Sequence, residues 1–169
     1  MTETSDGQSD RFTDPLVRLW RYADRILVRC PKCAGCASVL PEPTTTARPG
    51  PSNPHRRLSC LGCGHTAGWT APRHDNYWIV PELNGPDDPY FGLPLWLRAE
   101  CCGGNVLWAY NAEHLALLES YLAARLRERG AYRGSMSLVE RLPAWLKSAK
   151  HRTEALRTIR RLRTTLPAD

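Results

Sequence analysis

The feature that most constrains this chain is a pair of Cys-x-x-Cys motifs, Cys30–Cys33 and Cys60–Cys63, separated by 26 residues. Four thiolates presented by two short turns match the ligand set of a tetrahedral metal ion, because each turn supplies two sulfurs from one side. The spacing therefore predicts a closed, structural Zn²⁺ site with no open position for a substrate. Forming such a site would contribute on the order of 10 kcal/mol to folding of the surrounding residues.

Three further cysteines leave other readings of the metal chemistry open. Cys36 extends the first motif, but an iron–sulfur run of the ferredoxin type would need a cysteine where Leu40 stands. A rubredoxin-like iron site has similar spacing, although the intervening loop lacks the aromatic residues around which such a site packs. We interpret Cys36 as a small residue at the exit of the first turn, Cys101 as core and Cys102 as half exposed.

Composition places the chain among globular proteins, with 42% hydrophobic and 24% charged residues in 169. The formal charge is +6, and a four-thiolate Zn²⁺ centre with a local charge of −2 would bring it to about +4. The polar first 15 residues do not resemble a signal peptide, and no apolar run approaches the ~18 residues of a membrane span. We therefore expect a cytoplasmic protein with reduced thiols.

The order of motifs predicts an α+β fold in three parts. Residues 1–13 are expected to be a disordered tail, and residues 14–110 a zinc ribbon extended by a β-hairpin. Residues 111–169 are expected to be helical. Within the ribbon we expect a short helix beginning at Asp14, then strands at 26–30, 37–40, 66–71 and 77–80. Residues 41–57, rich in Pro, Thr and Ser, are expected to be a mobile loop.

Residues 93–111 predict a hairpin in which Gly103-Gly104 is a two-residue turn. That turn would place Cys101 opposite Val106, Ala99 opposite Trp108 and Leu97 opposite Tyr110.

The last third of the chain predicts helices with recognisable boundaries. Asn111 can cap a helix that ends at Gly130. Ser137 and Glu140 match a capping box. Pro143 then either kinks the following helix or opens a new one. The first of these helices is expected to bury a stripe made of Leu115, Leu118, Leu122 and Leu126.

The C-terminal helix carries a second pattern, a cationic side on which acidic residues are nearly absent. Such a side is typical of contact with nucleic acid or another polyanion, although a solvated helix face gives the same pattern. Arg56-Arg57 in the loop is a further candidate contact. The candidate nucleic-acid-binding residues on the helix are Lys147, Lys150, Arg157, Arg160 and Arg161.

The sequence contains no phosphate loop, nucleophile elbow, His-Glu-x-x-His motif or dinucleotide fingerprint. The favoured function is a non-catalytic zinc-ribbon protein that binds nucleic acid or serves as an adaptor in nucleic-acid machinery. The alternative is a protein–protein interaction module with a purely structural zinc, docking through exposed aromatic residues such as Trp69. An enzyme is a third option, which a pocket joining Cys102 and His114 would support.

Four segments carry a family resemblance: CPKC, CLGCG, the run DPYFGLPLWL with CCGGNVLWAYN, and MSLVERLPAWLKSAK. In these segments the chain resembles a family of uncharacterised bacterial zinc-ribbon proteins. Their ribbon is likened to that of transcription initiation factor B, and some are labelled primosomal replication-restart helicases. The resemblance implies zinc at the four motif cysteines. The chain has no helicase motor motif, so that activity is not carried over.

Overall fold

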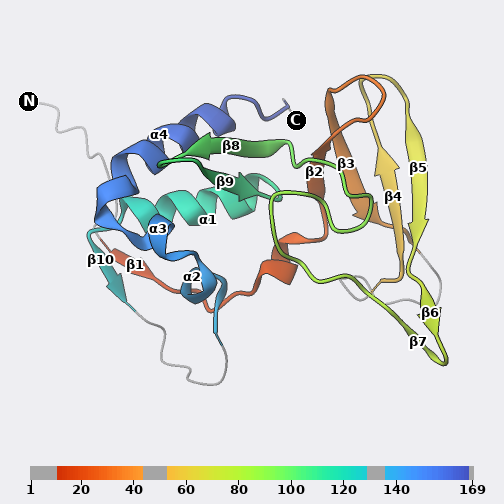
Figure 1. Cartoon of the computed structure of the whole chain (residues 1–169), viewed down its shortest axis with the longest axis horizontal. Coiled ribbons are helices and arrows are strands. Elements are labelled where there is room, and N and C mark those ends of the chain that lie inside the picture. Colours follow the sequence, from red (N-terminus) through yellow and green to blue (C-terminus); the bar gives the residue numbers. More distant parts are fainter. Residues whose placement is uncertain (1–10, 44–52, 129–135, 168–169) are drawn as a thin grey trace, which may run out of the picture.

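The computed structural model describes residues 11–43, 53–128 and 136–167 as a mixed α+β fold, as the sequence predicts (Figure 1). A four-stranded antiparallel sheet, ordered β2-β3-β4-β5, lies at one end of the molecule. The helices and the β8–β9 hairpin lie at the other end. Residues 1–10, the middle of the predicted mobile loop (44–52) and Gly130 lie outside the described residues.

The sheet consists of β2 (Ile26–Arg29), β3 (Cys36–Pro41), β4 (His55–Ser59) and β5 (Thr66–Thr70). The strands expected at 26–30, 37–40 and 66–71 are confirmed. The predicted loop over 41–57 is too long, because Pro41 still belongs to β3 and His55 already begins β4. Arg56 and Leu58 alternate into the core, so β4 has the period of a half-buried strand with an arginine at one inward position.

Residues 11–13 are not part of a disordered tail. They form β1 (Arg11–Thr13), which pairs in parallel with β10 (Leu126–Glu128), and Phe12 packs edge-on against Tyr121 with ring centroids 5.5 Å apart. This pairing also overturns the prediction of a helix running to Gly130. Helix α1 (Ala112–Ala123) ends before extended backbone at Ala124, and Leu126 is 55% exposed.

The helix expected from Asp14 is replaced by a turn and a short 3₁₀ helix, η1 (Leu19–Tyr22). Asp14 does act as a local cap, since its Oδ1 accepts a hydrogen bond from the Leu16 amide at 2.8 Å. It also accepts a hydrogen bond from the Ser137 hydroxyl, which joins this turn to the start of the C-terminal helices.

The second hairpin consists of β8 (Leu97–Cys101) and β9 (Asn105–Ala109). Its turn has three residues rather than two, because Cys102, Gly103 and Gly104 all have positive φ, at 56°, 79° and 86°. Cys101 therefore lies opposite Asn105, so the predicted register is wrong by one residue. Such a slip exchanges the faces of one strand relative to the other. The buried positions of the hairpin are Leu97, Cys101, Leu107 and Ala109.

A smaller hairpin of β6 (Arg73–His74) and β7 (Tyr77–Trp78) extends beyond the ends of β4 and β5 (Figure 1). The strand expected at 77–80 is thus only two residues long.

Four short helices complete the fold. They are α2 (Leu138–Arg141), α3 (Ala144–Lys147), the 3₁₀ helix η2 (Ala149–His151) and α4 (Arg152–Arg163). The capping box is confirmed, because the Ser137 hydroxyl accepts from the Glu140 amide while the Glu140 carboxylate accepts from the Ser137 amide. Pro143 ends α2 and opens α3, the second of the two predicted outcomes. Ala155, Thr158, Ile159 and Leu162 form the buried side of α4.

One hydrophobic cluster joins the sheet to the helical part within the described residues. The main connections are made by β2, whose Leu27 amide donates to the Tyr110 carbonyl at 2.7 Å and whose Val28 bridges to Leu95. Asn111 caps α1 through its Oδ1 and donates from Nδ2 to the carbonyls of Tyr22 and Arg25. The strand that leads to the first cysteine is therefore fixed from both sides.

Candidate metal centre and surrounding surface

Strand order brings the two Cys-x-x-Cys turns to the same edge of the sheet. The chain turns at residues 30–35 between β2 and β3, and at residues 60–65 between β4 and β5. Because β3 and β4 are antiparallel neighbours, both turns lie at the same end of the strands. Two hairpins with local turns therefore converge without any contribution from the helical part.

The two turns repeat the same backbone hydrogen bonds. The Cys30 amide donates to the Gly35 carbonyl at 2.8 Å, and the Cys60 amide donates to the His65 carbonyl at 2.9 Å. The residue after each second cysteine has positive φ, 59° at Ala34 and 72° at Gly64. An amide also approaches sulfur, since Lys32 N lies 3.4 Å from Cys30 Sγ. In this arrangement the sulfurs of one turn face the sulfurs of the other.

The four sulfurs form one cluster, referred to below as the cysteine cluster: Cys30, Cys33, Cys60 and Cys63. All four Sγ atoms lie within 4.8 Å of one another. Cys30 Sγ is 3.7 Å from Cys63 Sγ, and Cys33 Sγ is 3.6 Å from Cys60 Sγ. A tetrahedral ion with metal–sulfur bonds of about 2.3 Å requires sulfur pairs about 3.8 Å apart. The structure thus brings the four predicted ligands into a possible metal site.

The thiols of the cluster influence one another's ionisation. Burial opposes ionisation of Cys30, but the amides of Cys33 and Lys32 and the neighbouring thiols lower its pKa to about 7. The His65 amide favours ionisation of Cys63, but hydrogen bonds with Cys33, burial and the other thiols raise its pKa to about 12. Without a cation the four groups therefore cannot all ionise near neutral pH. A bound divalent cation would supply the missing positive charge.

The three other cysteines lie outside this cluster. Cys36 is half-buried at the start of β3, and burial raises its pKa to about 11. Cys101 is buried as predicted, but Cys102 is buried too, rather than half exposed. The Cys102 amide donates to a Glu154 carboxylate oxygen at 2.6 Å. The side chains of Cys102, His151 and Glu154 form a second group of potential ligands within 4.8 Å, which the sequence spacing did not indicate.

The candidate nucleic-acid contacts occupy several elements rather than one helix. Arg157, Arg160 and Arg161 lie on the exposed side of α4, whereas Lys150 lies in η2 and is also exposed. Lys147 lies in α3, and its Nζ donates to the Glu140 carbonyl. Two arginines of α4 are held by Glu119 of α1, through contacts of 4.0 Å from Arg160 and 2.5 Å from Arg163.

Arg56 cannot serve as the surface contact that the sequence suggested, because its side chain is 0% exposed. Its Nη1 donates to the Ala23 carbonyl at 3.0 Å, and its guanidinium lies 4.4 Å from the centre of the Tyr90 ring. Burial lowers the pKa of Arg56, an effect opposed by Tyr90 and by Asp24 and Asp88. The neighbouring Arg57 remains exposed.

The aromatic residue expected to be exposed is also placed differently. Trp69 is half-buried and packs against Tyr90, with ring centroids 5.0 Å apart. Three consecutive exposed apolar residues instead lie on and just after the β6–β7 hairpin: Tyr77 is 58% exposed, Trp78 38% and Ile79 47%. Trp78 of the same hairpin lies under the guanidinium of Arg73, 5.1 Å from its ring centre.

A cavity of about 560 Å³ is lined by His114 but not by Cys102, so the pocket that would have joined these two residues is not present in the described part of the chain. No helix among the described residues is long and apolar enough to cross a membrane. No family model, curated protein or solved structure matches this chain. Its function must therefore be argued from the residues themselves.

Proposed function

We propose that the cysteine cluster binds Zn²⁺ and that the sheet around it is a structural zinc ribbon. Two features support zinc. All four donors are thiolates, which favour zinc or iron over hard cations such as Mg²⁺ and Ca²⁺, and the sulfur distances suit a closed tetrahedral ion. The two cysteine turns, residues 30–35 and 60–65, contain no Phe, Tyr or Trp of the kind that packs around a rubredoxin iron. Among the described residues the group of ligands at this site consists of these four thiols, and a bound ion would hold the two hairpins together.

We infer that the chain acts as a non-catalytic nucleic-acid-binding protein or an adaptor in nucleic-acid machinery. The observation that carries this proposal is the cationic face, defined here as Lys150, Arg157 and Arg161. All three side chains are exposed, and none has an ion pair among the described residues. Arg157 and Arg161 are four residues apart, a spacing that places them on one side of α4, and Lys150 lies in η2, which directly precedes α4.

Two acidic residues lie near the cationic face. Glu119 is paired with Arg160 and Arg163. Glu154 accepts the Cys102 amide, but a bond from a neutral amide does not cancel the charge of a carboxylate. Three cations against the single carboxylate of Glu154 leave the face with a net positive charge that can attract phosphates. Lys147 and Arg56 are left out of the proposal because their side chains are directed to internal carbonyl groups.

Fluorescence anisotropy with labelled single-stranded DNA, duplex DNA and RNA tests this proposal across a series of salt concentrations. The variant K150E/R157E/R161E should bind at least tenfold more weakly. On duplex DNA, the slope of log affinity against log salt should become shallower by about 2.7, since each phosphate contact contributes about 0.9. The matched control R21E/R25E/R125E changes the net charge equally at exposed positions outside both this face and the cavity lined by His114. Equal losses in both triple variants would reduce the effect to net charge and contradict the proposed face.

A protein–protein interaction module is the second candidate, favoured by the exposed apolar residues of the β6–β7 hairpin. Tyr77, Trp78 and Ile79 are each at least 38% exposed on a hairpin that projects from the sheet (Figure 1). Aromatic residues on such a projection are typical of interface anchors. Pull-downs after nuclease treatment distinguish the two candidates. A partner retained by the wild type but lost from Y77S/W78S would favour this module over nucleic-acid binding.

A further inference from the structure

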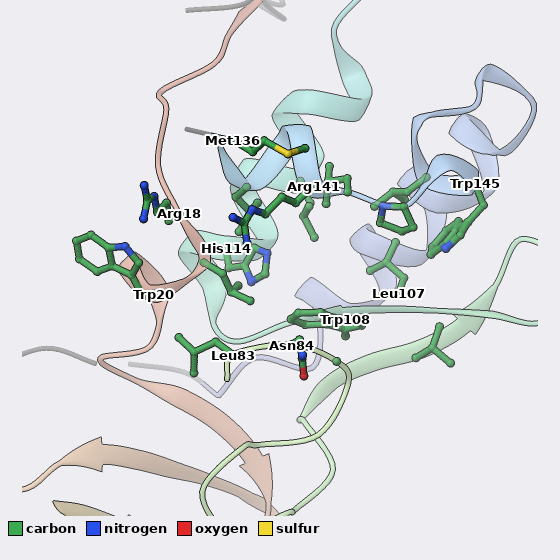
Figure 2. Close-up of a pocket in the computed structure, with 18 residues that line it drawn as sticks. Arg18, Trp20, Leu83, Asn84, Leu107, Trp108, His114, Met136, Arg141 and Trp145 are labelled. Carbon is green, nitrogen blue, oxygen red and sulfur yellow. The ribbon is translucent and has the colours of Figure 1, made fainter. Parts of the chain in front are cut away.

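The cavity beside His114 lies in the helical part, away from the cysteine cluster. It is enclosed by η1, β9, α1, residues 83–85 and the α2–α3 segment (Figure 2). Its volume of about 560 Å³ falls within the range of small-molecule sites, which is roughly 300–1,000 Å³. The elements around it come from four distant parts of the sequence, so no local motif could have indicated it.

Aromatic and aliphatic side chains form most of the cavity wall. Three of the chain's six tryptophans, Trp20, Trp108 and Trp145, line it. Trp20 is 49% exposed, so one indole borders the opening. Trp108 belongs to β9, where it lies opposite Arg98. Flat indole walls favour a flat apolar ligand body.

His114 contributes a hydrogen-bond donor to the cavity. Its Nδ1 accepts from the Tyr110 amide at 3.2 Å, so the neutral ring carries its proton on Nε2. The imidazole ring stacks on Tyr22 with ring centroids 5.0 Å apart. It also makes an edge contact with Trp108, with ring centroids 5.7 Å apart. Burial lowers the pKa of His114 to about 3, which keeps the ring neutral at pH 7. Nε2–H is thus the ring donor left for a ligand.

The charged groups of the cavity have one sign. Arg18 and Arg141 line it with exposed side chains, and neither has an ion pair among the described residues. Asn84 is the remaining polar residue of the lining, which contains no carboxylate. In Figure 2 the labelled Arg141 lies beside His114, and Arg18 lies at the edge of the same pocket, near Trp20. A ligand with a negative head group would therefore meet two guanidinium groups without any opposing charge.

We propose that this cavity binds a small organic anion. The flat apolar body of the ligand packs against the tryptophans, and its carboxylate or sulfonate head pairs with Arg18 and Arg141. The His114 Nε2–H group donates a hydrogen bond to the ligand from the buried side. This site is independent of the cysteine cluster and of the cationic face, because it shares no residue with either.

Two dyes with the same body but different charge test the proposal in the full-length, zinc-loaded protein. The anionic probe is 8-anilinonaphthalene-1-sulfonate, and the neutral probe is N-phenyl-1-naphthylamine, which lacks the sulfonate. Both fluoresce on entering an apolar site. We expect saturable binding of the anion at one site per chain. R18Q/R141Q should weaken it at least tenfold and change the affinity for the neutral dye less than twofold, because only the head-group contacts are removed.

Two further variants control the experiment. V106W narrows the cavity from β9 and should weaken both dyes, and R125Q removes an exposed arginine outside both the cavity and the cationic face and should change neither. Circular dichroism establishes that each variant is folded. Absence of saturable anion binding, or binding unaffected by V106W, would overturn the assignment of the site. Equal loss of both dyes in R18Q/R141Q, or no loss of the anion, would overturn the assignment of an anionic ligand.

Discussion

The buried histidine on α1 makes the stability of this protein depend on pH in a calculable way. His114 is 2% exposed, and burial lowers its pKa from 6.5 to about 3. In the unfolded chain the same imidazole takes up a proton near pH 6.5. A depressed folded pKa contributes stability that is fully present above the unfolded pKa, and that stability is lost as pH falls from 6.5 toward 3. Acid therefore favours the unfolded state through this residue.

The size of this effect between pH 7.5 and 5.5 follows from the unfolded pKa alone, because the folded ring stays neutral throughout that range. Linkage gives a loss of about 1.4 kcal/mol in unfolding free energy. The variant H114N removes the titrating ring and keeps an acceptor that can reach the Tyr110 amide. At pH 7.5 the variant should be less stable than the wild type because packing is lost. At pH 5.5 the difference in unfolding free energy between the two proteins should be smaller by about 1.4 kcal/mol, because only the wild type loses stability through the histidine.

Urea unfolding of both proteins, followed by far-ultraviolet circular dichroism at the two pH values and at saturating zinc, measures this difference. The remaining titrating groups and the metal ligands are common to both proteins, so they cancel in the comparison. Parallel pH dependence in the wild type and H114N would refute the reasoning, since it would mean that the imidazole titrates alike in the folded and unfolded states.

Three further predictions concern stability, each measured by chemical unfolding. Gly64→Ala should lower the unfolding free energy by about 1 kcal/mol, because its φ of 72° disfavours a side chain, whereas Ala34→Gly at φ 59° should raise it by up to about 1 kcal/mol. A stabilising Gly64→Ala or a destabilising Ala34→Gly would contradict the equivalence of the two turns. Leu122→Ala should cost about 2–5 kcal/mol and Leu126→Ala less than about 0.5, because only Leu122 is buried. Equal losses from the two substitutions would instead support the longer helix, running to Gly130, that the sequence predicted. Arg56→Met should cost about 2–4 kcal/mol through lost hydrogen bonding and cation–π contact, without weakening nucleic-acid binding of the folded protein. If Arg56 were instead a surface contact, the substitution would leave stability nearly unchanged and weaken nucleic-acid binding.

Features encoded by neighbouring residues could be predicted from the sequence. The two Cys-x-x-Cys turns form within six residues each, and the strands on either side follow from them. The capping box at Ser137 and Glu140 and the cap at Asn111 likewise depend on residues three apart. In each case the side chain satisfies a backbone group of its own turn, so the surrounding fold does not change the outcome.

Features that depend on distant partners could not be predicted. Leu126 continues a helical stripe in the sequence, but β10 forms because β1 offers a strand more than 100 residues away. In the sequence Arg56 looks like a loop residue. It is buried in the fold because the Ala23 carbonyl accepts its hydrogen bond and the Tyr90 ring packs against its guanidinium. The hairpin register depended on Cys102, whose positive φ lengthened the turn by one residue. The cavity beside His114 has walls from four separate segments and no sequence signature.

X-ray absorption at the zinc K-edge, on protein purified with one equivalent of metal, tests the central claim most directly. The account predicts one zinc per chain surrounded by four sulfurs at about 2.3 Å, with no nitrogen or oxygen in its shell. A shell containing nitrogen or oxygen, such as Cys102, His151 and Glu154 would supply, would contradict the assignment of the ion to the cysteine cluster. Purified protein that retains no zinc when its thiols are reduced would contradict the metal site itself.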